Sequence, residues 1–379
     1  MAGGDSQDDA LFLFRDSPLR RAALAASPND PVRYSLYGAD ELARRGHQVA
    51  IRLARAGGYP RIYHWPGYFC DRLLRRRSWS SGLFAAAFSF LTEIRRVRIV
   101  VSTVDSIGIP LLWMKRWGLF KTPLIYISVG FPERLAAMPP EGQGVYRDLL
   151  GLSDVVIAFG YEESLKLKEF LGVPFQSRVR FIPFGAHTGL FSLPRGDVSD
   201  GPDVLSVGAD PMRDFQVILR TAELRPDWKF ELIASAEHAS RLTRLPQNVR
   251  LSTDMPFTQT LERMNSARVV ALPVRENSYS GATTTLLQAM ALGRATVVSR
   301  VGAIRDGYGF IDHQNLRWVE SNDPVRWAEI LDQLMSDDDG RLRLGQRAQA
   351  HAATSLSWQR FTDAIGAALA EVSGGKEYP

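Results

Sequence analysis

The chain has little cysteine and no long apolar stretch. Cys70 is the single cysteine among 379 residues, which excludes a framework of intramolecular disulfides and is typical of a reducing compartment. The longest apolar stretch, residues 83–91, is far shorter than the roughly 20 residues needed to span a bilayer. The first residues are acidic and polar, unlike a secretory signal or a mitochondrial presequence. These absences predict a cytoplasmic protein, soluble or peripheral on the inner face of the cell membrane.

Two patterns of ligand-binding residues are also missing. No predicted strand is followed by Gly-x-Gly-x-x-Gly, which disfavours a dinucleotide-dependent oxidoreductase. No cluster of histidine, cysteine and acidic residues has the spacing of a metal site. The acidic run 337–339 lies between two helical segments, where helix capping and solvation explain it better than metal binding. The sequence therefore predicts neither a metal nor a bound cofactor.

Positive charge is concentrated in residues 61–121, in a chain whose net charge is +5. Arginines and lysines greatly outnumber acids in this basic aromatic segment, and tryptophan, tyrosine and phenylalanine lie between them. Such a composition suits an anionic membrane surface or a lipid-linked substrate. It also fits a solvated basic face over a buried aromatic core, or a nucleic-acid surface. Nucleic acid is the least favoured of these partners, and the sequence does not decide between the other two.

Short apolar runs alternate with helical patterns along most of the chain, which is typical of βαβ units and a parallel sheet. In the first half, strands are expected at residues 11–14, 48–53, 99–103, 124–128, 155–159 and 179–183. In the second half they are expected at 203–208, 230–234, 249–252, 268–273, 296–299 and 317–319. Residues 192–202, rich in Pro, Gly, Ser and Asp, form the strongest linker signal. We therefore expect an α/β protein with two Rossmann-like domains, 1–192 and 193–379, facing each other across a cleft.

The segment from Glu276 to Gly293 carries the strongest functional signal. It follows the predicted strand 268–273 and continues into a helix that should end at Gly293. The first turn of this helix contains Gly281, Ala282, Thr283 and Thr284. A strand–loop–helix of this kind places unpaired N–H groups and the positive helix end at the carboxyl edge of a sheet, where phosphorylated ligands bind. Threonine hydroxyls would add donors for a diphosphate, although a capped core helix without a ligand fits the segment equally well.

Four segments in the right order resemble the GT-B glycosyltransferases, and within them the retaining family 4. Residues 287–298, Leu-Gln-Ala-Met-Ala-Leu-Gly-Arg-Ala-Thr-Val-Val, are similar to that family's Leu-Glu-Ala-Met-Ala-x-Gly-x-Pro-Val-Val segment. Residues 301–307 are similar to the loop that follows it, and residues 181–191 resemble the interdomain segment Ile-Pro-Asn-Gly-Val-Asp-x-x-x-Phe. Ser357-Trp358 matches the Ser-Trp that opens the closing helix. The resemblance implies a GT-B fold, with the C-terminal helix packing back.

The chain departs from the family at two glutamates that are commonly separated by seven residues. Ser280 and Gln288 occupy their places. Glutamine can still hydrogen-bond ribose hydroxyls, whereas serine cannot replace a carboxylate at the anomeric carbon. Glu276, four residues before Ser280, is therefore the first candidate catalytic carboxylate, and a solvated loop acid is its other interpretation.

The resemblance also implies a basic group that holds the donor diphosphate. Arg213 takes the place of the family's usual lysine in the segment that starts near Gly208, and Arg275 is a second candidate. An ordinary surface arginine is the alternative for Arg213. The expected donor-binding set is Gly208, Arg213, Arg275, Ser280, Gly281, Ala282, Thr283, Thr284 and Gln288.

On the acceptor side, many relatives end the fourth strand of the first domain with a histidine, which this chain lacks. The segment after the predicted strand 124–128 instead offers Ser128, Gly130, Phe131 and Glu133 as candidate acceptor contacts. Asp105, which follows the predicted strand 99–103, is the second candidate catalytic carboxylate and is expected to point towards the cleft. Of six histidines, only His187 lies near the interdomain crossing, and a structural role is predicted for it.

The resemblance implies a metal-independent transferase that moves a sugar from a nucleotide diphosphate to an acceptor hydroxyl with retention of configuration. The nucleotide-sugar is then a co-substrate rather than a bound cofactor. The basic aromatic segment favours a lipid-linked or membrane-delivered acceptor of glycan or polysaccharide assembly over a soluble small molecule. Because Ser280 and Gln288 are altered, a catalytically silent GT-B protein that binds nucleotide-sugar or a partner is the alternative.

Overall fold

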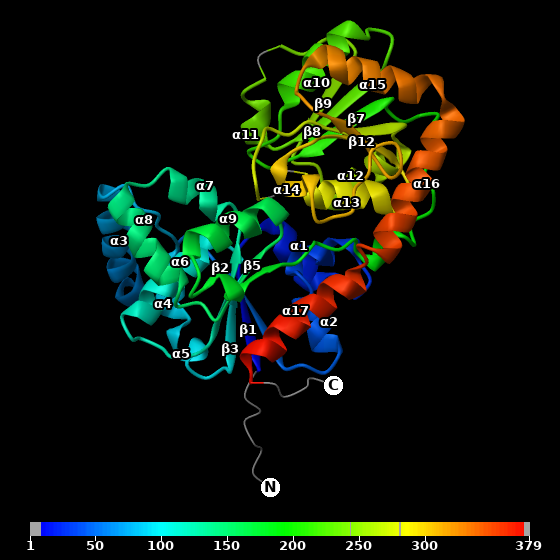
Figure 1. The fold of residues 1–379 in the computed structure, drawn as a ribbon. Helices are drawn as coiled ribbons and strands as arrows, with labels where there is room; N and C mark the ends of the chain where they lie inside the picture. Colours follow the sequence, from blue (N-terminus) through cyan, green and yellow to red (C-terminus); the bar gives the residue numbers. More distant parts are fainter. Residues whose placement is uncertain (1–8, 243, 280–281, 375–379) are drawn as a thin grey trace. The chain divides into compact units, whose positions relative to one another are not determined.

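A computed structural model describes residues 9–242, 244–279 and 282–374 of this chain. The chain divides into two compact units (Figure 1). Unit 1 comprises residues 1–25, 35–182 and 361–379, and unit 2 comprises residues 26–34 and 183–360. Each unit is built around a six-stranded sheet whose strands are all parallel. The predicted α/β class with two parallel sheets is confirmed.

The sheet of unit 1 has the strand order β2-β1-β3-β4-β5-β6. Its strands are β1 Ala10–Arg15, β2 Val49–Ala54, β3 Ile99–Ser102, β4 Leu124–Ser128, β5 Val155–Ala158 and β6 Val179–Phe181. Strands β3, β4 and β5 are buried along their whole length. Helices cover both faces of a parallel sheet, so these central strands read in the sequence as continuous apolar runs rather than alternating ones.

The helices of unit 1 pack around this sheet (Figure 1). They are α1 Pro18–Ala25, α2 Ala39–Arg44, α3 Arg61–Arg76, α4 Phe84–Ser89, α5 Leu91–Ile94, α6 Asp105–Arg116, α7 Phe131–Ala136, α8 Pro140–Leu150 and α9 Tyr161–Leu171. Much of the basic aromatic segment lies inside this unit. Trp79 and Phe84 are buried, and the ring of Trp79 stacks on that of Trp113 with centroids 6.4 Å apart. For these side chains the interpretation as a buried aromatic core is right.

The sheet of unit 2 has the strand order β12-β11-β10-β7-β8-β9. Its strands are β7 Val204–Gly208, β8 Phe230–Ala234, β9 Val249–Thr253, β10 Val269–Leu272, β11 Ala295–Ser299 and β12 Arg317–Val319. Its helices are α10 Phe215–Leu224, α11 Ala236–Ala239, α12 Phe257–Ser266, α13 Thr283–Ala291, α14 Gly302–Arg305, α15 Pro324–Ser336 and α16 Asp338–Thr354. In Figure 1, α10 and α15 lie on one face of this sheet, and α12 and α13 lie on the other.

Two helix ends in unit 2 are as the sequence predicts. Gly293 follows the end of α13 with φ of +67°, a left-handed conformation that glycine adopts readily, so it ends the helix as predicted. Asp337 caps α16, because its Oδ1 accepts a hydrogen bond of 2.7 Å from the N–H of Gly340. The capping interpretation of the acidic run 337–339 is therefore right.

The units are bounded differently from the predicted domains. The first crossing lies between Ile182 and Pro183, ahead of the Pro- and Gly-rich stretch that suggested residue 192. The chain returns to unit 1 at Phe361, inside α17 Trp358–Val372. The predicted tail helix is present, and Phe361 packs edge-on against Phe159 of unit 1 with ring centroids 5.8 Å apart. In the part of the chain that the structure describes, none of the helices is both long and apolar enough to cross a membrane.

Candidate active site

The strand order of unit 2 locates the first candidate site. The chain runs from β7 outward to β9, then crosses to β10 on the other side of β7. The connections that leave the carboxyl ends of β7 and β10 therefore run to opposite faces of the sheet. Open α/β sheets bind ligands in the crevice between two such connections. Arg213 lies in the loop after β7 and pairs with Val274 in the loop after β10 through an isolated bridge. The sheet topology thus brings the two predicted donor-binding segments together.

The side chain of Arg213 is buried, with 4% of its surface exposed. Its Nη2 donates a hydrogen bond of 3.0 Å to Oγ1 of Thr285, in the first turn of α13. Its Nε and Nη1 have no hydrogen-bond partner among the described residues. Burial lowers the pKa of the Arg213 guanidinium to about 10, and the carboxylate of Asp210 acts in the opposite direction. The group therefore still carries its positive charge at neutral pH.

This arrangement is unfavourable without an anion. A buried guanidinium has lost its hydration, and the start of α13 beside it is the positive end of the helix dipole. An oxyanion of two or more negative charges would pair with the free nitrogens of Arg213 and with the helix end. We call the set Gly208, Arg213 and the first turn of α13 the Arg213 site.

Gly208 shapes this site by having no side chain. A Cβ at Gly208 would lie 2.1 Å from Nε of Arg213. The last residue of β7 must therefore be glycine for the guanidinium to occupy its place. The prediction of Gly208 as a donor-site residue stays a prediction, but its contact with Arg213 gives it a physical reason.

A hydrogen-bond network joins the loop after β7 to the loop after β10. Oγ of Ser299 donates to Oδ1 of Asn322 at 2.7 Å and accepts from the N–H of Val274 at 2.9 Å. Nδ2 of Asn322 donates to the carbonyl of Val274 at 3.1 Å and to Oδ2 of Asp214 at 3.2 Å. Ser299 and Asn322 were not predicted as site residues, because isolated polar residues at strand ends give no recognisable sequence signal.

The other donor candidates lie around α13. Gln288 is buried on this helix, and its amide pairs with no described residue. Arg275 is exposed, and its Nη2 donates to the carbonyl of Pro211, so it ties the β10 loop to the β7 loop. Ala282 and Thr283 are buried and Thr284 is partly exposed at the start of the helix. Ser280 and Gly281 lie outside the described residues.

Glu276 is exposed in the loop between β10 and α13. Its Oε1 accepts a hydrogen bond of 2.8 Å from the N–H of Gly302, at the start of α14. The neighbouring Asn277 accepts from the N–H of Ala303 through its carbonyl at 2.9 Å. Glu276 therefore joins two loops at the carboxyl edge of the sheet while one carboxylate oxygen is left for other contacts.

A second candidate site lies in unit 1, at the carboxyl ends of β3 and β4. Asp105 begins α6 and is fully buried. Its Oδ1 accepts hydrogen bonds from the Tyr126 hydroxyl at 2.5 Å and from the N–H of Val129 at 3.2 Å. Its Oδ2 lies 3.7 Å from Nη1 of Arg134. Burial raises the pKa of Asp105 to about 6, although Arg134 and the hydrogen bonds oppose this shift.

Glu163, on α9, completes this acidic cluster and was missed by the sequence analysis. Its Oε1 accepts hydrogen bonds from the Ser128 hydroxyl at 2.6 Å and from the N–H of Gly130 at 2.8 Å. Its Oε2 is buried without a partner among the described residues. Burial raises the pKa of Glu163 to about 8, so the carboxyl holds a proton over most of the neutral range. In the sequence Glu163 looks like an ordinary acid in the first turn of a helix.

The remaining acceptor candidates divide into two groups. Gly130 and Glu133 lie at the start of α7, where Gly130 has φ of +78°. Phe131 is fully buried and packs against Tyr146 with ring centroids 5.7 Å apart. The side chain of Phe131 therefore belongs to the core of unit 1, and an approach of the acceptor to the backbone here stays a prediction. His187, as predicted, has structural contacts: its Nδ1 accepts from the N–H of Gly189 at 3.1 Å.

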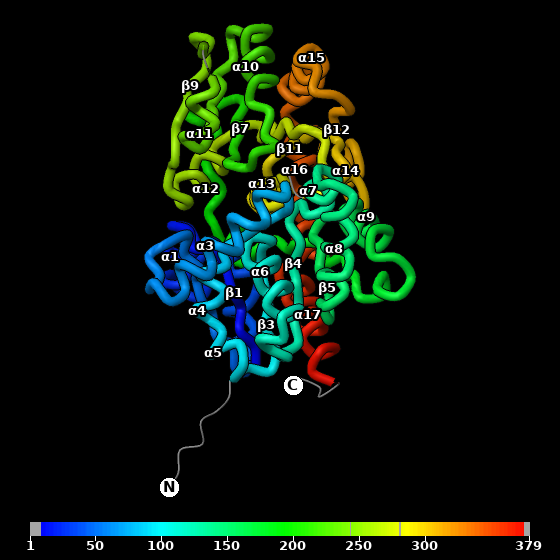
Figure 2. Tube along the Cα trace, turned by 90° about the vertical axis from the view of Figure 1, so that its left-hand side faces the viewer, coloured from blue at the N-terminus to red at the C-terminus, as the bar shows by residue number. Residues whose placement is uncertain are grey.

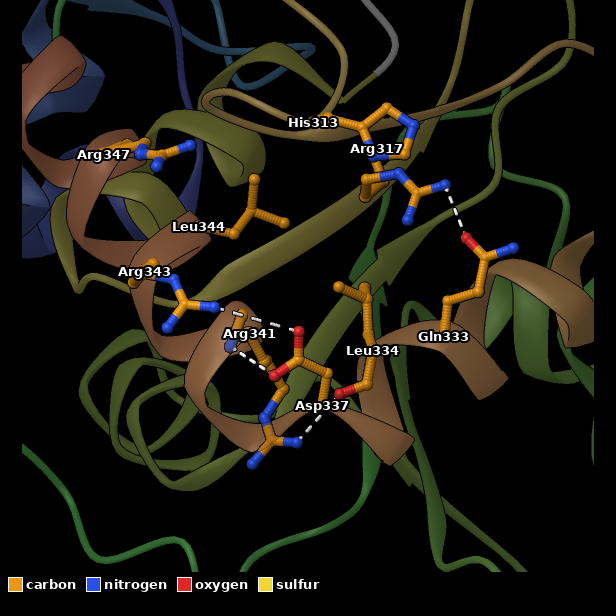
Figure 3. Close-up of a pocket in the computed structure, with 10 residues that line it drawn as sticks. His313, Arg317, Gln333, Leu334, Asp337, Arg341, Arg343, Leu344 and Arg347 are labelled. Atoms are coloured by element: carbon orange, nitrogen blue, oxygen red, sulfur yellow. Dashed lines mark hydrogen bonds and ion pairs between the residues drawn. The ribbon is translucent and has the colours of Figure 1, made fainter.

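Figure 3 shows another cavity in unit 2, of about 410 Å³, between β12, α15 and α16. Four arginines line it: Arg317, Arg341, Arg343 and Arg347. Nη2 of Arg317 donates to Oε1 of Gln333 at 2.9 Å, and Arg341 pairs with Asp338 at 2.6 Å. The first pair joins β12 to α15 and the second lies within α16, and the cavity shares no residue with the Arg213 site. We assign it no function.

Comparison with known proteins supports this description. Residues 202–337 match the family model described as Glycosyl transferases group 1. A curated relative, D-inositol 3-phosphate glycosyltransferase from Corynebacterium diphtheriae, is 30% identical over 167 residues, which are 42% of this chain and 36% of the relative. The chain thus spans little more than a third of that relative's length.

Solved structures resemble the whole chain. Anabaena HepE, in complex with UDP and glucose, has a TM-score of 0.69 at 13% identity and covers 96% of this chain and 99% of its own. Sucrose-phosphate synthase from Thermosynechococcus elongatus has a TM-score of 0.69 at 16% identity, with 95% and 98% covered. Such identities establish the fold alone. The chain therefore has the GT-B fold, and its residues 202–337 match the model of glycosyl transferases group 1.

Proposed function

We propose that this chain is a retaining glycosyltransferase that moves a sugar from a nucleoside diphosphate to an acceptor hydroxyl. The observation that carries the proposal is Arg213, whose buried guanidinium keeps two nitrogens unpaired beside the first turn of α13. A diphosphate matches this site in charge and in its number of acceptor oxygens. The UDP held by HepE, whose fold this chain shares, supports the same ligand class.

The Arg213 site would act on the leaving group. As the glycosidic bond breaks, negative charge grows on the diphosphate oxygen that departs from the sugar. The guanidinium of Arg213 and the N–H groups of α13 are fixed before the reaction, so they stabilise this charge without reorganisation. In a same-face reaction the leaving phosphate itself takes the acceptor proton. This route needs no enzymic nucleophile, and it accommodates the serine at position 280.

The two candidate carboxylates receive different roles. Glu276 is exposed at the carboxyl edge of the sheet of unit 2, so we propose that it contacts the donor sugar. Asp105 is fully buried and its Oδ1 is occupied by Tyr126 and Val129. We therefore propose that Asp105 acts as a positioning residue for the loop after β4, which follows Ser128 and contains Val129 and Gly130.

For the acceptor we propose a lipid-linked or membrane-delivered glycan, as in polysaccharide assembly. The exposed part of the basic aromatic segment supports this class. The relative from Corynebacterium diphtheriae is named for D-inositol 3-phosphate, a soluble phosphorylated alcohol, so that acceptor is the natural second choice.

A turnover assay tests the proposed reaction. The protein is incubated with a panel of nucleotide-sugars, with and without a glycan-lipid or inositol phosphate acceptor. We expect release of nucleoside diphosphate from one donor class, and a product whose anomeric configuration in the proton NMR spectrum equals that of the donor. Product of inverted configuration would contradict retention. Nucleotide binding without either transfer or slow donor hydrolysis would favour the catalytically silent alternative.

A further inference from the structure

Helix α3 of unit 1 carries an apolar stripe that faces solvent. Ile62, Trp65, Phe69 and Leu73 recur at spacings of three and four residues, so they lie along one side of the helix. Their side chains are 73%, 63%, 66% and 46% exposed. Single exposed apolar residues are ordinary, but a continuous stripe of this kind marks a surface that binds something.

The opposite side of α3 is firmly packed, so the helix cannot turn to bury the stripe. Gly67 lies against α4, where a Cβ at this position would come within 2.5 Å of the backbone nitrogen of Ala85. Leu74 is buried on the same side. Figure 1 shows α3 at the outer edge of unit 1, and in Figure 2, turned by 90°, it lies at the front. The stripe therefore belongs to a rigid surface element.

Arginines flank the stripe. Arg61, Arg72 and Arg76 are exposed, and at helical spacing they lie beside the stripe rather than opposite to it. A cavity of about 470 Å³ is lined by Tyr68, Asp71, Arg72, Arg75 and Arg76. Arg72 and Arg76 form no hydrogen bond or ion pair with another described residue. Their charges are thus available to an external anion.

We infer that α3 docks unit 1 on an anionic lipid bilayer. The stripe enters the boundary between headgroups and acyl chains, and the arginines of the adjacent cavity bind lipid phosphates. An apolar stripe beside a basic flank on a helix too short and too charged to span a bilayer is the pattern of a helix that lies in the membrane surface. The inference concerns residues 61–76 alone; Trp79 and Phe84, later in the basic aromatic segment, are buried and take no part in it.

This inference deepens the proposed function, because it identifies the surface from which a membrane-delivered acceptor would come. It excludes nucleic acid as the partner of α3, since a phosphate backbone would pair with the arginines but leave the apolar stripe in water. It also gives the exposed tryptophan a role, since Trp is favoured at the interface between headgroups and hydrocarbon.

Vesicle co-sedimentation tests the inference, using phosphatidylcholine vesicles with and without phosphatidylglycerol. We expect the wild type to bind the anionic vesicles selectively. The double variant Trp65→Ser/Phe69→Ser should lower the partition coefficient by about a hundredfold or more. The double variant Arg72→Gln/Arg76→Gln should lower it by about fivefold per arginine and only on anionic vesicles.

The matched control is Leu165→Ser/Val173→Ser, which removes exposed apolar side chains from α9 and the loop after it. This control should bind vesicles like the wild type. Absence of wild-type binding, or an equal loss in the control, would overturn the inference. Sedimentation velocity gives a further test. A wild type that is dimeric, together with a monomeric Trp65→Ser/Phe69→Ser variant, would also overturn the inference, because a second copy of the chain would then cover the stripe. Nucleotide binding is measured separately, so failure of the proposed function would not imitate failure of docking.

Discussion

Replacing Arg213 with methionine is expected to lower kcat/KM for the nucleotide-sugar donor by about 100- to 1,000-fold. The same change should raise the melting temperature of the ligand-free protein. Methionine fills a similar volume without a charge, and the native guanidinium is buried with two nitrogens unpaired. Activity and stability would thus change in opposite directions. Steady-state kinetics and thermal unfolding of the purified variant measure the two effects.

Arg294→Met is the matched control for this experiment. Burial also lowers the pKa of Arg294 to about 10, yet its Nη2 bonds the carbonyl of Gly196 at 3.2 Å and Oδ1 of Asn265 at 3.1 Å. Its removal leaves these acceptors unpaired and should cost about 1–3 kcal/mol of stability while kcat/KM is kept. Gly208→Ala, whose Cβ would displace the Arg213 guanidinium, should reduce donor binding with little loss of stability. Unchanged kinetics in Arg213→Met would contradict the assigned role.

Glu163→Gln is expected to make the protein more stable than the wild type by a few kcal/mol at pH 8, but not at pH 5. The pKa of Glu163 is raised from 4.5 to about 8, mainly by burial. Between these values the unfolded chain releases its proton while the folded chain keeps it, so wild-type stability falls as the pH rises. Glutamine imitates the protonated acid and can accept the same hydrogen bonds from Ser128 and Gly130.

The measurement is chemical unfolding of both proteins at several pH values between 5 and 8.5. The difference between wild type and variant isolates Glu163 from the other titrating groups. The pKa of Asp105 is also raised, to about 6, so the free energy of unfolding of the variant should still fall with rising pH, but less steeply than that of the wild type. Parallel stability curves for the two proteins would show that the Glu163 carboxyl is ionised and stabilised in the folded state, contrary to this account.

The sheets were predictable from the sequence because both are parallel and covered on both faces. Each predicted strand is present, since central strands such as 155–158 and 269–272 are apolar on both sides. The unit boundary was less predictable. The stretch 192–202 has the composition of a linker, but the crossing lies at residue 182, inside the segment 181–191 that resembles the family's interdomain segment. The composition of a segment predicts a loop, but it does not predict in which unit the residues on either side of that loop are packed.

The candidate sites were predictable only in part. The resemblance identified Arg213, but its burial and its two unpaired nitrogens follow from how β7, β10 and α13 meet in space. Glu163 could not be found, because its environment is made by Ser128 and Gly130 on another strand end. Helix α3 was not predicted, because Pro66 lies inside it and proline disfavours a helix interior, although its apolar residues recur at helical spacing.

The most direct test of the central claim is calorimetric titration with UDP, GDP, ADP and dTDP and with their monophosphates. The account predicts that one diphosphate binds at least about thirtyfold more tightly than its monophosphate, because the second phosphate pairs with the buried guanidinium. It predicts that Arg213→Met removes this preference and that Arg294→Met keeps it. Equal affinity for diphosphate and monophosphate, binding that survives in Arg213→Met, or no binding of any nucleotide would contradict the claim that the Arg213 site holds a donor diphosphate.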